Sequence, residues 1–284
     1  MGFSWLAAAV ACVDSADAGP RVLDGAGRDV KVPARPARIV SLAPSVTEIL
    51  FAMGAGERVV GVTDYCDFPP EARSRTRIGG LINPDLEKIV SLKPDLAMAT
   101  TTGNYLDDAE RIERLGIPVY TINTPTVESM LKTLETIGDL VGEPARSRTL
   151  SGQLRSRIDQ VRVSAGRHVR VRTLFVIEGD PLIAPGRGTF LGEALAIAGA
   201  DLVTKDAPAS WGQYDLEQVI RMKPELLLTA EPNRGWALGL TRRPEWLGIP
   251  AVAGHHVVVI SDSIQHPGPR LVDGIEEVGK IVQS

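Results

Sequence analysis

The fold is decided by two stretches of sequence that are versions of each other, DLEKIVSLKPDLAMAT at residues 85–100 and DLEQVIRMKPELLLTA at residues 215–230. Aligned without a gap, they share Asp, Leu, Glu, Lys, Pro and Leu, and most other pairs are conservative. Each stretch begins with an aspartate that can cap a helix, continues at helical spacing and is broken by a Lys-Pro pair. An apolar run typical of a fully buried strand follows. The chain is therefore predicted to contain two copies of one α/β unit.

Two further matches occur in the same order along the chain. TEILFAMGA at 47–55 is repeated as GEALAIAGA at 192–200, and LGIP at 115–118 returns at 247–250. Strands that alternate with helices predict parallel sheets covered by helices on both faces. The apolar runs expected to be strands are 38–42, 59–62, 96–99 and 119–122 in the first half, and 171–177, 226–228 and 257–260 in the second.

A different kind of segment lies between the halves. Pro125 is expected to open a first helix, and residues 145–165 contain no proline and one glycine, which predicts a long continuous second helix. About 20 helical residues span roughly 30 Å, close to the diameter of one lobe. Such a connection predicts limited hinge motion, whereas a Gly/Ser linker would predict the opposite.

The fold class predicted from these patterns is α/β, with two Rossmann-like lobes of mostly parallel sheets joined by a long rigid backbone helix. The expected organisation is a lead segment at 19–37, a first lobe at 38–124, connecting helices at 125–166 and a second lobe at 167–284.

The beginning of the chain differs from the rest. Phe3–Val13 is an apolar run followed by Ala16-Asp17-Ala18, which is typical of a secretory signal peptide at 1–18. A lipoprotein signal ending at Cys12 and a short buried helix are the alternatives. We expect a location in the periplasm or at the cell surface. If Cys12 is removed or lipidated, Cys66 has no disulfide partner and needs burial.

Composition narrows the classes of partner. The 284 residues are 44% hydrophobic and 23% charged, as in ordinary soluble globular proteins. The net charge of −4 argues against a nucleic-acid binder, because such a domain normally gathers Lys and Arg on one face.

In its longer segments the sequence resembles the helical-backbone class of ABC-importer substrate-binding proteins, which carry vitamin B12, haem and ferric siderophores. The resemblance extends from about Arg38 to Val282. It rests on the segments RIVSLAPSVTEILFAMGAGERVVGVTDYCDFPP, NPDLEKIVSLKPDL, PGRGTFLGEALAIAGA, ASWGQYDLEQVI and GPRLVDGIEEVGKIV. Within the class, TDYCDFPP and the tryptophan of ASWGQYDLEQ are most similar to the vitamin B12 (cobalamin) carriers.

The resemblance implies a function and a partner. Such a carrier captures its ligand between the lobes and delivers it to the membrane permease, so a bound corrinoid is cargo and no cofactor or resident metal is implied. Glu87 and Glu217 match the two glutamates that such carriers place on the lobe tips to dock against permease arginines. The alternative is that each glutamate is simply favoured in the first turn of a helix by the helix dipole. We expect a monomer.

The resemblance also implies a ligand site. Its expected residues are Tyr65 and Trp211, which match cleft aromatics, and Asp262, His266 and Arg270, which reach the cleft from the second lobe. The sequence departs from the corrinoid pattern at Leu81 and Thr100, where tryptophans are found, and at His266, where an arginine is found.

Other interpretations remain open. A ferric-siderophore or haem carrier of the same class is the main alternative, with His266 or Tyr65 as a possible iron ligand. Trp236 and Trp246 either line the cleft entrance or anchor a long loop. An α/β enzyme is a further alternative, although the sequence has no G-x-S-x-G elbow and no phosphate-cradling loop.

Overall fold

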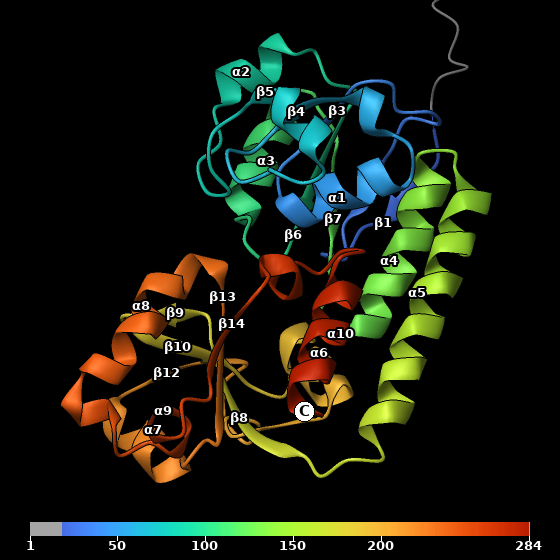
Figure 1. Ribbon diagram of the computed structural model, residues 1–284. Coiled ribbons are helices and arrows are strands. Elements are labelled where there is room, and N and C mark those ends of the chain that lie inside the picture. Colours follow the sequence, from blue (N-terminus) through green and yellow to red (C-terminus); the bar gives the residue numbers. More distant parts are fainter. Residues whose placement is uncertain (1–18, 284) are drawn as a thin grey trace, which may run out of the picture.

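The computed structural model of the protein describes residues 19–283, so the expected signal peptide and Cys12 lie outside the described residues. Two α/β lobes are stacked along a pair of helices that runs down one side of both (Figure 1). The predicted fold class is confirmed. Within the described range, no helix combines the length and apolar character that a bilayer crossing requires.

The first lobe is built on a five-stranded parallel sheet in the order β5-β4-β3-β6-β7. Its strands are β3 (Ile39–Ser41), β4 (Val59–Val62), β5 (Thr76–Arg77), β6 (Leu96–Thr100) and β7 (Val119–Ile122). Its helices are α1 (Pro44–Ala52), α2 (Leu86–Ser91) and α3 (Leu106–Arg114). Every residue of the inner strand β6 is buried, as expected for a sheet covered on both faces. The edge strand β7 is also fully buried, and the Gly25 amide of the lead segment donates to its Thr121 carbonyl oxygen.

The lead segment forms a hairpin of β1 (Arg21–Leu23) and β2 (Asp29–Lys31). Arg28 fixes this hairpin to the first lobe. Its guanidinium pairs with Asp24 and Glu113 and donates to the Val119 carbonyl oxygen at 3.0 Å.

The second lobe has a parallel sheet in the order β11-β8-β13-β14. These strands are β11 (Ala200–Leu202), β8 (Val171–Val176), β13 (Leu226–Ala230) and β14 (Val257–Ile260). A small antiparallel sheet of β9 (Glu178–Gly179), β10 (Leu182–Pro185) and β12 (Trp211–Tyr214) was not predicted. The helices of this lobe are α6 (Phe190–Ala198), α7 (Leu216–Met222), α8 (Arg234–Gly239), α9 (Pro250–Ala253) and α10 (Leu271–Val282).

The two repeated stretches begin in the same way. Asp85 caps α2 by accepting a hydrogen bond from the Lys88 amide at 3.0 Å, and Asp215 caps α7 by accepting one from the Gln218 amide at 2.7 Å. Each cap satisfies an amide at the start of a helix that has no partner within the helix.

The repeated stretches also end in the same way. Lys93 and Lys223, each directly before a proline, take left-handed φ values of 48° and 47°. Arg38 donates to the carbonyl oxygens of Leu92 and Lys93, and Arg172 donates to those of Met222 and Lys223. An arginine at the start of a neighbouring strand therefore caps the carboxyl end of both helices.

The connection consists of α4 (Val127–Leu140) and α5 (Pro144–Ala165). α4 begins two residues after Pro125, because Thr126 supplies the cap by accepting from the Ser129 amide. α5 is one continuous helix of 22 residues, as predicted. Arg157 of α5 binds Glu276 of α10 at 2.7 Å and Asp273 at 2.6 Å, which joins the connection to the second lobe.

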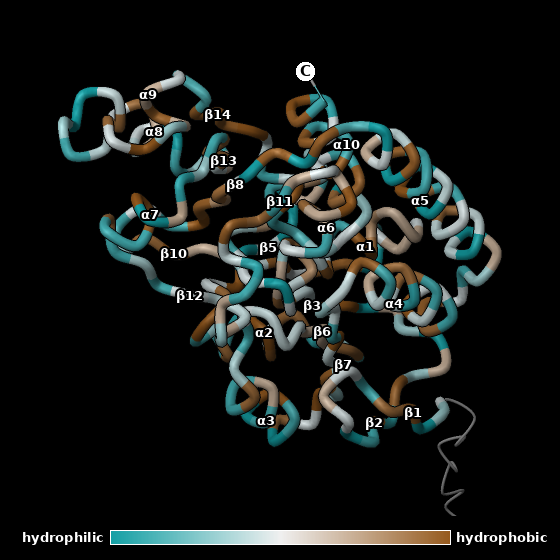
Figure 2. Tube along the Cα trace, turned by 90° about the horizontal axis from the view of Figure 1, so that it is seen from below, coloured by the Kyte–Doolittle hydropathy of each residue, from teal (hydrophilic) through white to brown (hydrophobic). Residues whose placement is uncertain are grey.

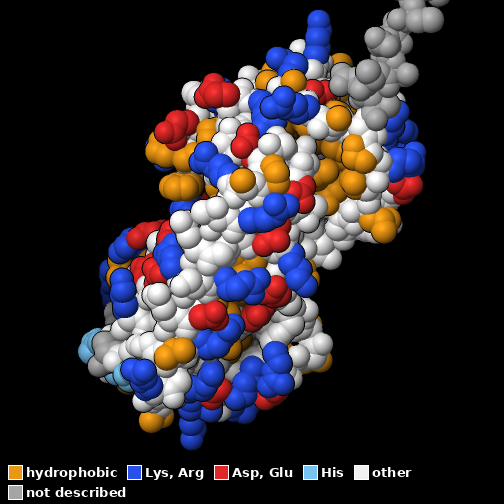
Figure 3. Space-filling model, turned by 90° about the vertical axis from the view of Figure 1, so that its right-hand side faces the viewer, with side chains coloured by type: hydrophobic (Ala, Val, Ile, Leu, Met, Phe, Trp, Pro, Cys, Tyr) orange, Lys and Arg blue, Asp and Glu red, His pale blue; other side chains and the backbone are white. Residues whose placement is uncertain are grey.

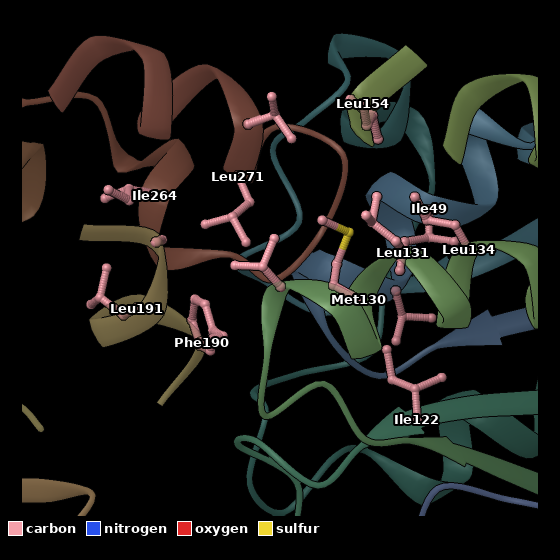
Figure 4. Close-up of a cluster of buried hydrophobic side chains, with 14 of the residues drawn as sticks. Ile49, Ile122, Met130, Leu131, Leu134, Leu154, Phe190, Leu191, Ile264 and Leu271 are labelled. Carbon is pink, nitrogen blue, oxygen red and sulfur yellow. The ribbon is translucent and has the colours of Figure 1, made fainter. Parts of the chain in front are cut away.

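One hydrophobic core continues from lobe to lobe through these helices. Figure 4 shows Met130 of α4 between Phe190 and Leu271 of the second lobe and Ile49 of the first. The two lobes are therefore packed on a shared support, which is the helix pair α4 and α5.

On the face of the molecule that carries α5, basic and acidic side chains are interspersed (Figure 3).

The structure shows whether Trp236 and Trp246 line the cleft entrance or anchor a segment of the second lobe. Trp236 and Trp246 meet edge to face with ring centroids 5.5 Å apart, in the core formed by β8, β10, β13 and the segment 236–252. A Cβ at Gly179 would lie 2.5 Å from the Trp236 ring. Both tryptophans therefore anchor this segment in the second lobe, and the segment forms short helices where a long loop was expected.

Candidate functional site: the cleft between the lobes

A cavity of about 220 Å³ lies between the two lobes. Four of the five expected ligand-binding residues line it: Tyr65 from the first lobe and Asp262, His266 and Arg270 from the second. The remaining lining residues, which the sequence analysis did not identify, are Pro44, Glu48, Asp67, Phe68 and Arg73.

Trp211 is the expected site residue that the structure does not place in this cavity. It lies at the start of β12, opposite Pro185 of β10, with 40% of its surface exposed. Its backbone is part of the small antiparallel sheet, which the sequence patterns did not predict.

Arg270 is held by groups from both lobes. Its Nη2 donates to Oε1 of Glu48 in α1 at 2.8 Å, and its Nη1 donates to Oδ1 of Asp262 at 3.4 Å. The guanidinium carbon also lies 4.1 Å from the centroid of the Phe68 ring, within the range of a cation–π interaction. Glu48 and Phe68 belong to the first lobe, so Arg270 bridges the cleft.

Glu48 is the one charged residue of α1. Its side chain is 2% exposed, and its Oε2 has no hydrogen-bond partner in the described part of the chain. Burial raises the pKa of the Glu48 carboxyl above its usual range, and the hydrogen bond from Arg270 opposes that shift. The sequence contained a signal that could have identified this residue, because Glu48 and Glu193 are the acids shared by the repeated segments 47–55 and 192–200.

Asp262 and His266 form a second polar pair beside Arg270. Nε2 of His266 lies 3.6 Å from Oδ2 of Asp262. The adjacent His266 imidazole and the nearby charge of Arg270 hold the pKa of Asp262 below its usual range. The second lobe thus offers an ionised carboxylate, an imidazole and a guanidinium within nine residues of chain.

Two aromatic side chains of the first lobe complete the cleft. Tyr65 is 62% exposed and Phe68 is 42% exposed, both in the loop that follows β4. A large exposed aromatic surface beside charged groups can bind a flat ligand by stacking while the polar groups fix its orientation.

The neighbouring Cys66 points the other way. It is fully buried, with its sulfur 3.1 Å from the hydroxyl oxygens of both Thr47 and Thr63. Burial raises the pKa of this thiol, which keeps it protonated and unreactive. Within residues 19–283, no three His, Cys, Asp or Glu side chains are arranged to hold a metal ion.

Glu87 and Glu217 occupy equivalent positions in the first turns of α2 and α7, and both are exposed. Glu217 lies 3.7 Å from Arg221. One helical turn later, each helix exposes an apolar side chain, Val90 at 44% and Ile220 at 37%. Both helices lie on the side of the molecule away from α5 (Figures 1 and 2).

Comparisons with known proteins agree with this geometry. Residues 39–263 match the family model described as periplasmic binding protein. An uncharacterized ABC transporter substrate-binding lipoprotein of Bacillus subtilis is 30% identical over 91% of this chain and 84% of its own length.

Two solved structures are similar in fold and sequence. The periplasmic vitamin B12-binding protein of Vibrio cholerae superimposes with a TM-score of 0.78 and 27% identity, covering 87% of this chain and 96% of the other. The apo periplasmic heme-binding protein of Roseiflexus superimposes with a TM-score of 0.79 and 26% identity, covering 87% and 97%. With two α/β lobes around a polar and aromatic cleft, the chain belongs to the periplasmic binding protein family.

Proposed function

We propose that the protein is the extracytoplasmic substrate-binding protein of an ABC importer, which captures a corrinoid between its lobes and delivers it to the permease. In this proposal the lobes are residues 38–124 and 167–284, and the protein acts as a monomer. The observation that carries the proposal is that Tyr65, Asp262, His266 and Arg270, implied by the resemblance to corrinoid carriers, line one cavity between the lobes.

The chemistry of the cleft suits a corrinoid. A corrin ring presents a broad flat surface, for which Tyr65 and Phe68 offer exposed aromatic faces. Its peripheral amides and nucleotide phosphate present oxygen acceptors that an arginine can bind. Trp211 is proposed to join the site from the rim, because its ring remains exposed.

The proposed docking surface consists of Glu87 and Val90 on the first lobe, and Glu217 and Ile220 on the second. Residues three apart are neighbours on a helix surface, so each lobe presents the same pair of an acid and a β-branched apolar side chain. Two equal pairs at a fixed separation suit a partner with two equivalent basic pockets.

Export is part of the proposal. A secretory signal at 1–18, or lipid attachment at Cys12, would place the carrier in the periplasm or at the cell surface. The lipoprotein relative from Bacillus subtilis supports the second route.

A thermal-shift panel tests the ligand. A ligand at one hundred times its Kd stabilises a protein by about 2.7 kcal/mol, which raises the melting temperature of a protein of this size by roughly 5 °C or more. We expect cyanocobalamin and dicyanocobinamide to give such a shift. No shift with either corrinoid would refute the corrinoid assignment.

A haem or ferric-siderophore carrier is the second candidate. Tyr65 and His266 line the same cavity, and each residue type can ligate haem iron. Haemin and ferric hydroxamate or catecholate siderophores therefore belong in the same panel, and a shift with one of them alone would favour this alternative.

A further inference from the structure

Arg270 makes the contacts that close the cleft. It leaves the second lobe at the start of α10 and meets Glu48 and Phe68, both from the first lobe. Glu48 and Arg270 are 222 positions apart in the chain, and their ion pair joins a buried carboxylate to a guanidinium that is 19% exposed. Such a bond resists separation of the lobes more strongly than an exposed ion pair would.

The cavity is small while this bond is made. Its volume of about 220 Å³ is below the range of about 300–1,000 Å³ found for pockets that hold drug-sized ligands. Both Glu48 and Arg270 are part of its wall. A ligand whose oxygen atoms bind Arg270 in this cavity therefore has to compete with Glu48 for the guanidinium.

Both members of the pair keep unused hydrogen-bonding capacity. Among the described residues, Oε2 of Glu48 and Nε of Arg270 are buried without a partner. Buried polar atoms of this kind are unfavourable, so the closed arrangement does not fully satisfy either side chain. A ligand that offers oxygen acceptors could satisfy the guanidinium better than Glu48 does.

We propose that Glu48 and Arg270 form an ionic latch across the cleft, and that a ligand with oxygen acceptors opens it by replacing Glu48 at Arg270. This inference rests on the proposed function only in that the cleft must take a ligand. The latch selects ligands whose carbonyl, carboxylate or phosphate oxygens can compete with the Glu48 carboxylate. Glu48 acts as a positioning residue in this scheme, because it acts through Arg270.

The test is the separation of the lobes in the ligand-free protein. Spin labels are attached through Glu71→Cys and Glu245→Cys, two exposed positions on different lobes, in a Cys12→Ser background. Distances between the labels are measured by electron–electron double resonance for four proteins: unaltered, Glu48→Ala, Arg270→Gln and the control Glu276→Ala. The control removes a carboxylate that binds Arg157 at 2.7 Å, away from the cleft.

We expect both latch variants to shift the distances to longer values by several ångströms, while the control and the unaltered protein agree. The use of two latch variants keeps the test decisive if one of them does not fold. Cyanocobalamin should also associate about tenfold faster with Glu48→Ala in stopped-flow fluorescence, because opening no longer limits entry. Equal distances in all four proteins would refute the latch. If cyanocobalamin binds to none of them, the corrinoid assignment fails, and the distances still decide the latch.

Discussion

Glu48 and Glu193 occupy the same position in the repeated segments 47–55 and 192–200, and each bonds outside its own lobe. Glu48 of the first lobe accepts from Arg270 at the start of α10 at 2.8 Å. Glu193 of the second lobe accepts from the backbone amide of Val127 at the start of α4 at 2.7 Å. Each acid thus binds the beginning of the helix that follows the last strand of the other lobe's sheet.

This relationship predicts different outcomes for the two equivalent acids. Glu193→Ala removes the acceptor for the Val127 amide, so we expect a loss of about 1–2 kcal/mol in the free energy of unfolding. Cyanocobalamin affinity should not change, because this bond lies outside the cleft. Chemical denaturation and ligand titration measure the two effects. Glu193→Gln is the control, since its amide oxygen can still accept; equal losses in both variants would contradict the explanation.

The docking proposal predicts that Glu87→Arg combined with Glu217→Arg abolishes ligand uptake by whole cells. Reversing both charges turns attraction to basic pockets into repulsion. Ligand affinity of the purified variant should match that of the unaltered protein. Glu135→Arg, at an exposed position of α4, is the matched control and should transport normally. Normal uptake by the double variant would exclude these acids from docking.

The packing of Trp236 against Gly179 predicts that Gly179→Ala destabilises the second lobe. A Cβ would lie 2.5 Å from the indole ring, so the ring must shift, at a cost of about 1–3 kcal/mol. Gly152→Ala is the counterpart. Gly152 lies inside α5 with nothing within 4 Å of a new Cβ, and the change should stabilise by about 0.5–1 kcal/mol. Thermal unfolding of both variants gives the comparison, and opposite signs are expected.

The contact of Arg157 with Glu276 predicts a loss of stability in acid. The hydrogen bonds from Arg157 hold the pKa of Glu276 below its usual value of 4.5. The unfolded chain therefore takes up the proton more readily than the folded protein, and this contribution is lost as pH falls below about 4.5. Glu276→Gln should reduce the dependence of unfolding free energy on pH below that value. An unchanged dependence would mean that the pair contributes nothing to acid sensitivity.

Local sequence patterns were sufficient to predict most of the strands and helices that hold the site in place. The seven predicted strands form because apolar β-forming runs end at turns or helix caps, and α5 forms because residues 145–165 contain no proline. The small antiparallel sheet of the second lobe was not predicted. Strands β9, β10 and β12 have only two to four residues each, and β10 pairs with β12 across about 30 positions of sequence, so no local pattern revealed this sheet.

Local sequence patterns also failed to reveal one important residue of the cleft. Tyr65, Asp262, His266 and Arg270 were identified through a resemblance, and the structure brings them to one cavity. Glu48 was missed because the repeat marks it only as equivalent to Glu193, and no local pattern reveals its partner. That partner is 222 positions away, and only the assembly of both lobes brings the two together.

The most direct measurement of the central claim is a calorimetric titration of the protein with cyanocobalamin, repeated with the combined variant Tyr65→Ala and Arg270→Ala. The account predicts one site per chain with a Kd of about 1 μM or tighter. It also predicts affinity at least about tenfold weaker in the variant, a loss of about 1.4 kcal/mol. Equal affinity in the two proteins would contradict binding of the ligand between the lobes.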